Sequence, residues 1–302
     1  MNFEVKIIED SVSPAGKRLT TITATYPRFI HSEIMTHRDR ARNAASSRAI
    51  PWPKMSEMVS EYPVVPVKWG MEQSGMQTGD EIPEKFLLLA EQIWLRARDS
   101  ALMYADMLAN IGQTYHDQKL PGWDHLTDSE RLLKVHKSLP NRIVEPWMWI
   151  TVVMTATEWK NFFRLRCHPD AEIHFQKIAC MIRDAMAESE PVVRALHLPF
   201  VQPDERVGVD ECGSKLPDSP VDRLCRISTA RCARVSYLTH EGKRDQDKDL
   251  ELFDRLCQGS GFGHWSPHEH VAFADNNPRL VSGPLRGWEQ YRKYFHNENE
   301  PG

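Results

Sequence analysis

The sequence has no long apolar run, no excess of positive charge and no signal-peptide pattern. A helix that crosses a membrane needs about 20 consecutive apolar residues, and no segment of the 302-residue chain approaches that length. The formal net charge is −4, so the chain lacks the overall positive charge of many nucleic-acid-binding domains. The N-terminus lacks the basic and apolar regions of a secretory signal. We therefore expect a cytoplasmic protein that has neither a membrane nor a nucleic acid as its partner.

Residues 36–48 hold the most informative feature, a concentration of arginines. Within this segment there are four arginines and a single acid, Asp39, together with an asparagine and two serines. Guanidinium groups next to hydroxyl and amide side chains are typical of phosphate sites, because the planar fork donates two hydrogen bonds at once. The segment therefore predicts an anion-binding site. A basic surface patch or an RNA contact is the alternative that residue types alone leave open.

A second concentration of polar residues lies at residues 263–270, where three histidines surround Glu269. Histidine and carboxylate are common ligands of zinc and iron. The spacing fits neither the H-E-x-x-H nor the H-x-x-E-H zinc motif, and the six cysteines of the chain form no C-x-x-C pair. We therefore expect no bound metal, and we expect His268 and His270 to be structural. The alternative is a metal-dependent hydrolase that uses His264, His268, Glu269 and His270.

Apolar patterning divides the chain into strands, helices and loops. A β-hairpin is expected at Val5–Asp10 and Leu19–Tyr26, since turn-forming residues separate two β-rich segments. The clearest helix spans Glu84–Gln113, where apolar residues recur at helical spacing. Further helices are expected over Arg28–Arg40, Pro146–Arg166, Pro169–Glu188 and Asp247–Cys257. Residues 259–266 predict a glycine-rich turn, and the polar stretch at 202–220 predicts a linker.

Taken together, the two polar segments resemble the flavin-dependent thymidylate synthases, a family that methylates dUMP through FAD. That family carries an arginine-histidine-arginine signature followed, after seven residues, by serine, and also a G-H-x-S/T-x-x-E-H segment. The first signature is matched by His37, Arg38, Asn43, Ser46 and Arg48, with Thr36 in place of the first arginine. The second is matched by Gly263, His264, Ser266, Glu269 and His270. A third family stretch is matched around Arg142 and Arg166.

The order of these motifs is reversed relative to common family members, in which the histidine-containing segment comes first. The resemblance therefore implies a circularly permuted chain, similar to an uncommon, often phage-encoded, branch of the family. We expect one catalytic domain over residues 1–302, with the arginine signature and long helices at 18–200, a linker at 201–221 and the permuted flavin-site segment at 222–302. The implied fold is α/β (α+β), with a central, mostly antiparallel sheet packed by long helices.

The resemblance also implies a reaction and a set of site residues. The reaction is the reductive methylation of dUMP to dTMP, with methylenetetrahydrofolate and NADPH as co-substrates and FAD as the cofactor that carries the chemistry. Arg166 and Ser46 are the implied catalytic residues, and Arg142 would reach the nucleotide from a neighbouring subunit of a homotetramer. The implied substrate-binding residues are Glu33, Ser46, Arg48, Arg142 and Arg166. The implied cofactor-binding residues are His37, Arg38, Asn43, Asn161, His264, Ser266 and Glu269.

Several positions depart from the family pattern. Thr36, Ala41 and Ala44 stand where the family has an arginine, a serine and a glutamate. Losing an arginine from a site for anionic ligands weakens or repositions them, and Arg40 and Arg42 either compensate for the loss or are simply solvated. The departures leave two alternatives open. One is a flavin-dependent hydroxymethylase of dUMP or dCMP, and the other is a non-catalytic relative that binds a nucleotide or RNA.

Overall fold

A five-stranded sheet forms the centre of the molecule, which the computed structural model describes over residues 1–302 except 120, 122–124, 243, 259–262 and 296–302. The turn predicted at 259–266 thus lies partly outside the described residues. In spatial order the strands are β3 (Ala41–Ala44), β4 (Trp149–Ala156), β2 (Arg18–Pro27), β1 (Glu4–Val12) and β5 (Val192–Val193). Neighbouring strands are antiparallel except β1 and β5, which are parallel. The mixed α/β class, with a mostly antiparallel sheet, agrees with the prediction.

The predicted β-hairpin is present as β1 and β2. Its register pairs Glu4 with Thr25 at one end and Val12 with Arg18 at the other. β2 is buried along almost its whole length, because it lies between β1 and β4 in the sheet. The β-branched residues that dominate β2 suit such a central strand, where both faces are packed.

The helix predicted over Pro146–Arg166 is wrong for its first half. Residues Trp149–Ala156 form β4, which pairs with β2 on one side and with β3 on the other, and only Lys160–Arg166 are helical (α7). Nearly all of β4 is buried, so it has no polar face from which a period could be read. A continuous apolar run is compatible with a buried strand or a buried helix, and the β-branched residues here favour the strand.

The helix predicted over Arg28–Arg40 is also wrong beyond its first turns. The observed elements are η1, a 3-10 turn (Arg28–Ile30), and α1, a short helix (His31–Ile34). The chain then turns into β3. Nη1 of Arg42 donates hydrogen bonds to the backbone carbonyls of Met35 and His37, each at 2.8 Å. These bonds satisfy carbonyls that a longer helix would have used internally.

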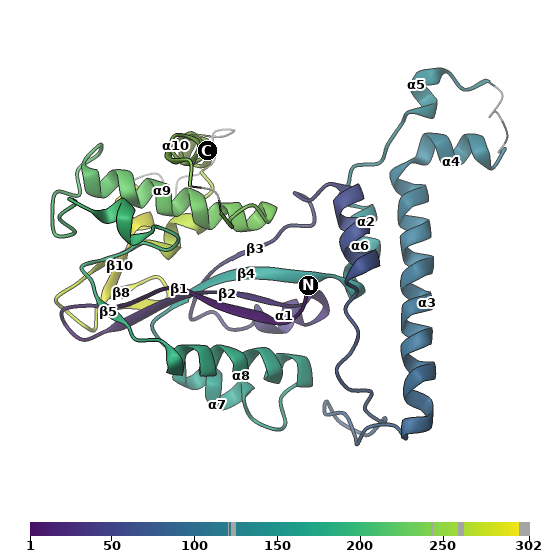
Figure 1. Ribbon diagram of the computed structural model, residues 1–302, viewed down its shortest axis with the longest axis horizontal. Coiled ribbons are helices and arrows are strands. Elements are labelled where there is room, and N and C mark those ends of the chain that lie inside the picture. The colour runs from purple at the N-terminus through teal and green to yellow at the C-terminus, as the bar shows by residue number, and fades with distance from the viewer. Residues whose placement is uncertain (120, 122–124, 243, 259–262, 296–302) are drawn as a thin grey trace.

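Helices cover the sheet on both sides (Figure 1). On one side are α7 and α8, where Phe162 and Phe175 pack in the same apolar cluster as Ile22 of β2 and Met154 of β4. On the other side are α9 and α10, together with the 3-10 turn η7, which contacts β3 and β4. Their bounds are Ile173–Glu188 for α8, Pro220–Arg234 for α9, Gln246–Gln258 for α10 and Ser266–His270 for η7. The helices predicted in the α8 and α10 segments are therefore confirmed.

A further group of helices stands beside the sheet (Figure 1). It consists of α2 (Trp52–Glu61), α3 (Glu84–Ala109), α4 (Ile111–Asp117), α5 (Asp128–Arg131) and α6 (Pro140–Ile143). α3 confirms the long helix predicted from Glu84, although this helix ends before Asn110 and α4 begins directly after it. Within α3 only Ala105 and Ala109 are buried. None of the helices in the described part of the chain is long and apolar enough to cross a membrane.

Buried polar contacts join the C-terminal segment to the central sheet. This segment contributes β7 (Ala272–Ala274) and β10 (Trp288–Gln290) to a small sheet with β6 (Leu196–His197), and it also forms the hairpin of β8 (Val281–Ser282) and β9 (Leu285–Arg286). The hydroxyls of Thr21 and Thr155 are 2.6 Å apart. They connect the buried rings of His197 and His270, each at 2.7 Å. The C-terminal segment is therefore fixed against β2 and β4 by side-chain hydrogen bonds as well as by packing.

The segment predicted as a linker, residues 201–221, packs against the rest of the molecule. It contains the 3-10 turn η4 (Pro203–Arg206), and Arg206 is buried. The guanidinium group of Arg206 pairs with Glu9 of β1 at 2.9 Å and donates to the carbonyl of Leu198 at 3.0 Å. This part of the segment therefore helps to hold β1 against the small sheet.

Candidate functional site

Three residues that the sequence assigns to the nucleotide lie around one cavity. Ser46, Arg48 and Arg142 line a pocket of about 300 Å³. The remaining lining residues are Arg28, His31, Ala44, Ala45, Ser47 and Glu145. We call this cavity the arginine pocket. Since Arg142 lies here beside Arg48 of the same chain, no neighbouring subunit is needed to bring these two residues together.

The backbone between β3 and α2 carries Ser46 and Arg48 into the pocket. Asn141, at the start of α6, is fully buried and holds this backbone in place. Its Nδ2 donates to the carbonyl of Ser47 at 2.6 Å and to the carbonyl of Ile50 at 2.9 Å. Because Arg142 follows Asn141 directly, one side-chain amide fixes the spacing between the two arginines. No local pattern in the sequence assigns this role to Asn141.

The charges of the arginine pocket favour an anion. Arg28 pairs with Glu145 at 3.2 Å. The guanidinium groups of Arg48 and Arg142 are exposed and have no hydrogen bond or ion pair within the described residues. Burial, and then the charges of Arg28 and a further arginine, lower the pKa of His31 to about 4, so His31 is neutral at pH 7. The pocket therefore offers two unpaired cations, which is the arrangement expected for a phosphate.

A second cluster contains Arg166, His37 and Glu33. Nε of Arg166 donates to Nε2 of His37 at 2.8 Å. Burial, together with the charges of nearby arginines including Arg166, lowers the pKa of His37 to about 4, so its ring is a neutral acceptor. Burial and the neighbouring Glu172 raise the pKa of Glu33, while Arg166 opposes them. The structure thus joins a predicted catalytic arginine to a predicted cofactor residue, although neither lines the arginine pocket.

The remaining predicted cofactor residues lie around β3 and η7. Asn43 is buried on β3 opposite Val153 of β4, while Ser266 and His264 are exposed. Glu269 forms an ion pair with Arg292.

Of the two other predicted cofactor residues, Arg38 lies near this group and Asn161 does not. Arg38 is exposed, and Arg38 and Glu269 both lie close enough to Arg42 to act on its pKa, in opposite directions. Asn161 is apart from this group. It lies on α7, across the sheet from η7, and its side chain accepts a hydrogen bond from Arg164 at 3.3 Å.

Arg40 and Arg42 are not simply solvated, because both guanidinium groups have partners within the protein. Arg40 is buried beside the rings of Trp159 and Phe162, with its guanidinium carbon 4.9 Å and 4.2 Å from their centroids. It pairs with Asp39 at 2.8 Å. Arg42 binds the two carbonyls that end α1. Both side chains are therefore used to build the fold, which corrects the expectation from the sequence.

Two histidines of the turn η7 were expected to have structural roles. His268 and His270 are fully buried, and burial lowers the pKa of each to about 3. Within the described residues no group of three or more His, Cys, Asp or Glu side chains is arranged to hold a metal ion. The geometry therefore gives no support to the hydrolase alternative.

Comparison with known proteins assigns no family. The sequence matches no protein-family model and no curated protein. Among solved structures the chain is similar to a UMP/dUMP methylase, PolB from Streptomyces cacaoi, bound with 5-Br dUMP: the TM-score is 0.42, the identity is 13%, and 62% of this chain and 90% of that chain are covered. The same methylase bound with 5-Br UMP gives a TM-score of 0.41 at 14% identity, covering 62% and 89%. A likeness at these scores carries no argument about activity.

Proposed function

We propose that the protein is a flavin-dependent thymidylate synthase, which converts dUMP to dTMP by reductive methylation. The arginine pocket is the observation that carries this proposal. Ser46 and Arg48 belong to one family motif and Arg142 belongs to another, far away in the sequence, yet all three line one cavity. These are the residues that the family resemblance assigns to the nucleotide, and their unpaired donors suit its 5′-phosphate.

The side chains of this chain have distinct tasks in the proposed reaction. Arg48 and Arg142 bind the phosphate, and the hydroxyl of Ser46 donates a further hydrogen bond to it. Arg166 acts on the pyrimidine: neutral His37 accepts from its Nε, while its terminal nitrogens have no hydrogen-bond partner within the described residues. These nitrogens stabilise the negative charge that develops on the pyrimidine carbonyls when the ring is activated.

The residues around β3 and η7 fit a polar, anionic cofactor such as FAD. Arg38 offers an exposed cation, and Ser266 and His264 offer exposed polar side chains, to which Asn43 and Glu269 add an amide and a carboxylate. Bound FAD would supply the redox chemistry of the reaction, and the protein would bind and orient it. Methylenetetrahydrofolate as the one-carbon donor and NADPH as the reductant complete the proposal. The contacts of η7 with β3 and β4 support the proposal, because they bring residues 266–270 next to the sheet in spite of their late position in the chain.

We further propose that the chain forms a homo-oligomer, with the homotetramer of the family as the expected state. Six large apolar side chains on α3 are exposed in the single chain: Phe86, Leu88, Leu89, Ile93, Met103 and Tyr104. A second copy would cover them. Light scattering coupled to size-exclusion chromatography tests this, with Ile93→Glu as a variant that is expected to dissociate the oligomer. A monomeric wild-type protein would contradict the proposal.

The activity is tested by mass spectrometry of the nucleotide after incubation with FAD, NADPH, methylenetetrahydrofolate and either dUMP or dCMP. A methylated dUMP product is expected. A hydroxymethylated product, or turnover of dCMP alone, would contradict the proposal and favour a hydroxymethylase. The departures from the family pattern at Thr36, Ala41 and Ala44 leave that alternative open. No product with directly supplied reduced flavin would overturn enzymatic function and favour the binding-protein alternative.

A further inference from the structure

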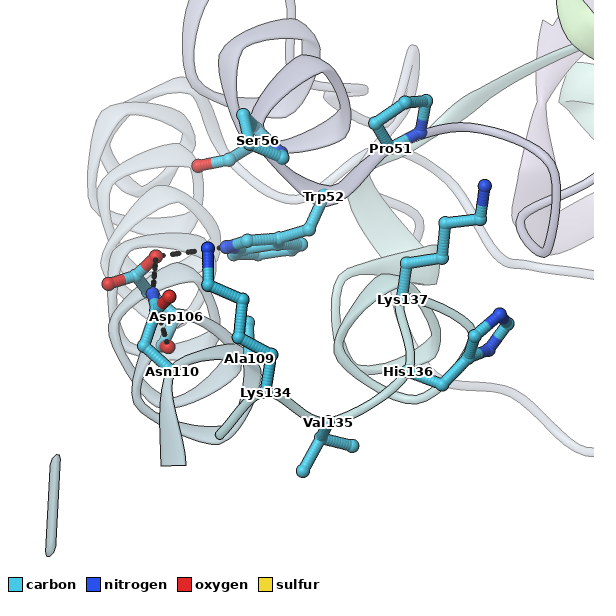
Figure 2. Close-up of a pocket in the computed structure, with 11 residues that line it drawn as sticks. Pro51, Trp52, Ser56, Asp106, Ala109, Asn110, Lys134, Val135, His136 and Lys137 are labelled. Atoms are coloured by element: carbon cyan, nitrogen blue, oxygen red, sulfur yellow. Dashed lines mark hydrogen bonds between the residues drawn. The ribbon is translucent and has the colours of Figure 1, made fainter. Parts of the chain in front are cut away.

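A second cavity, of about 410 Å³, lies on the helical side of the molecule (Figure 2). It is enclosed by the start of α2, the end of α3 and the segment Lys134–Lys137. None of its lining residues also lines the arginine pocket. Its volume falls within the range of small-molecule binding sites. The cavity is therefore separate from the site proposed for the nucleotide.

The apolar part of this second cavity is held rigidly. The ring of Trp52 lies between α3 and the Lys134–Lys137 segment (Figure 2). Its Nε1 donates to Oδ1 of Asp106 at 2.9 Å, and Nδ2 of Asn110 donates to the same oxygen at 3.1 Å. Further apolar lining comes from Pro51, Pro53, Ala109 and Val135. Trp52 is largely buried, so only a small part of its fixed indole ring faces the cavity.

The basic part comes from one short segment. Nζ of Lys137 donates to the carbonyl of Ala49 at 2.9 Å, and Nδ1 of His136 is 2.9 Å from the hydroxyl of Ser138. Lys134 is different, because its exposed ammonium has no hydrogen bond or ion pair within the described residues. Apolar walls with a small number of polar groups are typical of small-molecule sites. The one acid of the cavity, Asp106, already accepts two hydrogen bonds.

We propose that the second cavity binds a small aromatic anion, a ligand that joins a flat ring system to a phosphate or a carboxylate. The ring packs on Trp52 and the two prolines, and the anionic group accepts a hydrogen bond from Lys134. Phosphate and carboxylate share this recognition chemistry, and two probes distinguish them. AMP joins a two-ring base to a phosphate, and indole-3-acetate joins a two-ring system to a carboxylate.

The test is isothermal titration calorimetry of the intact protein with each probe. Lys134→Glu removes the free cation and is expected to weaken binding about 10-fold or more, since a hydrogen bond to a charged group contributes about 1.5–3 kcal/mol. Lys160→Glu, at an exposed lysine of α7 outside the cavity, is the matched control and should bind as the wild type does. Tighter binding of AMP or of indole-3-acetate identifies the anion.

Arg48→Ala separates this inference from the proposed function, because the phosphate of AMP could also enter the arginine pocket. AMP binding that survives Arg48→Ala and is lost in Lys134→Glu supports the second site. The opposite pattern would place AMP in the arginine pocket and overturn the inference. Absence of binding of both probes at millimolar concentration would also overturn it, while leaving the dUMP experiment unaffected.

Discussion

Two groups of arginines in this molecule have opposite surroundings. In the arginine pocket, Arg48 and Arg142 are exposed and unpaired within the described residues. On α9, Arg231 is buried and pairs with Glu205 at 2.6 Å and with Asp249 at 2.8 Å. The same residue type is therefore left without a protein partner in one place and is paired within the fold in the other.

The difference lies in which charges are already neutralised. Asp249 is fully buried and also pairs with Arg234 at 2.6 Å. Burial alone would raise the pKa of Glu205, but its hydrogen bonds with Arg231 and the Gln202 backbone hold that pKa at about 2. A buried charge must find its partner within the protein, because removing one partner leaves the other without water or counter-charge. An exposed guanidinium has no such need and stays available to a ligand.

The largest effect is expected from Asp249→Ala. This change leaves Arg231 and Arg234 buried without a shared acid, and breaking a buried ion pair costs about 3–5 kcal/mol. Urea unfolding followed by circular dichroism measures the loss. Asp247→Ala, at an exposed neighbour on the same helix, is the control and should change the free energy of unfolding by less than about 0.5 kcal/mol. Equal free energies of unfolding of the two variants would show that the buried arginines do not depend on Asp249 as proposed.

Arg48→Ala is expected to have the next largest effect, on binding alone. Loss of a charge-assisted hydrogen bond of about 1.5–3 kcal/mol should weaken dUMP binding about 10- to 100-fold, whereas the unfolding free energy should change by less than about 0.5 kcal/mol. Calorimetric titration and urea unfolding measure the two quantities. The exposed Arg279 provides the control variant, Arg279→Ala. Unchanged dUMP affinity in Arg48→Ala would remove Arg48 from the site.

Asn141→Ala tests the connection between fold and pocket. It leaves the carbonyls of Ser47 and Ile50 without their side-chain donor, so the unfolding free energy should fall by about 1–3 kcal/mol. Because the same amide fixes the spacing of the two pocket arginines, dUMP binding should weaken several-fold as well. Asn161→Ala, at an exposed asparagine, should leave stability unchanged. A lower free energy of unfolding combined with unchanged dUMP affinity would limit Asn141 to a structural role.

The smallest effect concerns pH. His37 has a pKa of about 4 in the folded chain and about 6.5 when unfolded. Between these values only the unfolded chain binds the proton, so stability is full above pH 6.5 and falls as the pH decreases toward 4. His37→Asn removes this contribution and should flatten the pH dependence of the unfolding free energy. An identical slope in the wild type and the variant would show that His37 does not titrate as proposed.

The sequence predicted the elements whose pattern is local. β-rich segments on either side of turn-forming residues identified the β1–β2 hairpin, and apolar residues at helical spacing identified α3. The same reasoning failed at β4. Its residues are buried on both faces, so only pairing with β2 and β3, which are distant in sequence, decides that it is a strand. The expectation that Arg40 is solvated failed for a related reason, because its burial depends on packing against Trp159 and Phe162.

The sequence by itself determined which residue types were candidates for the nucleotide site, because a phosphate needs guanidinium and hydroxyl donors wherever they come from. The family resemblance then implied the particular residues Ser46, Arg48 and Arg142, but not their neighbours Arg28 and Glu145, whose positions carry no local signal. Only the tertiary structure decided which arginines remain available. Every guanidinium carries the same charge, and burial beside an acid or a ring, rather than the sequence pattern, determines whether that charge is already neutralised.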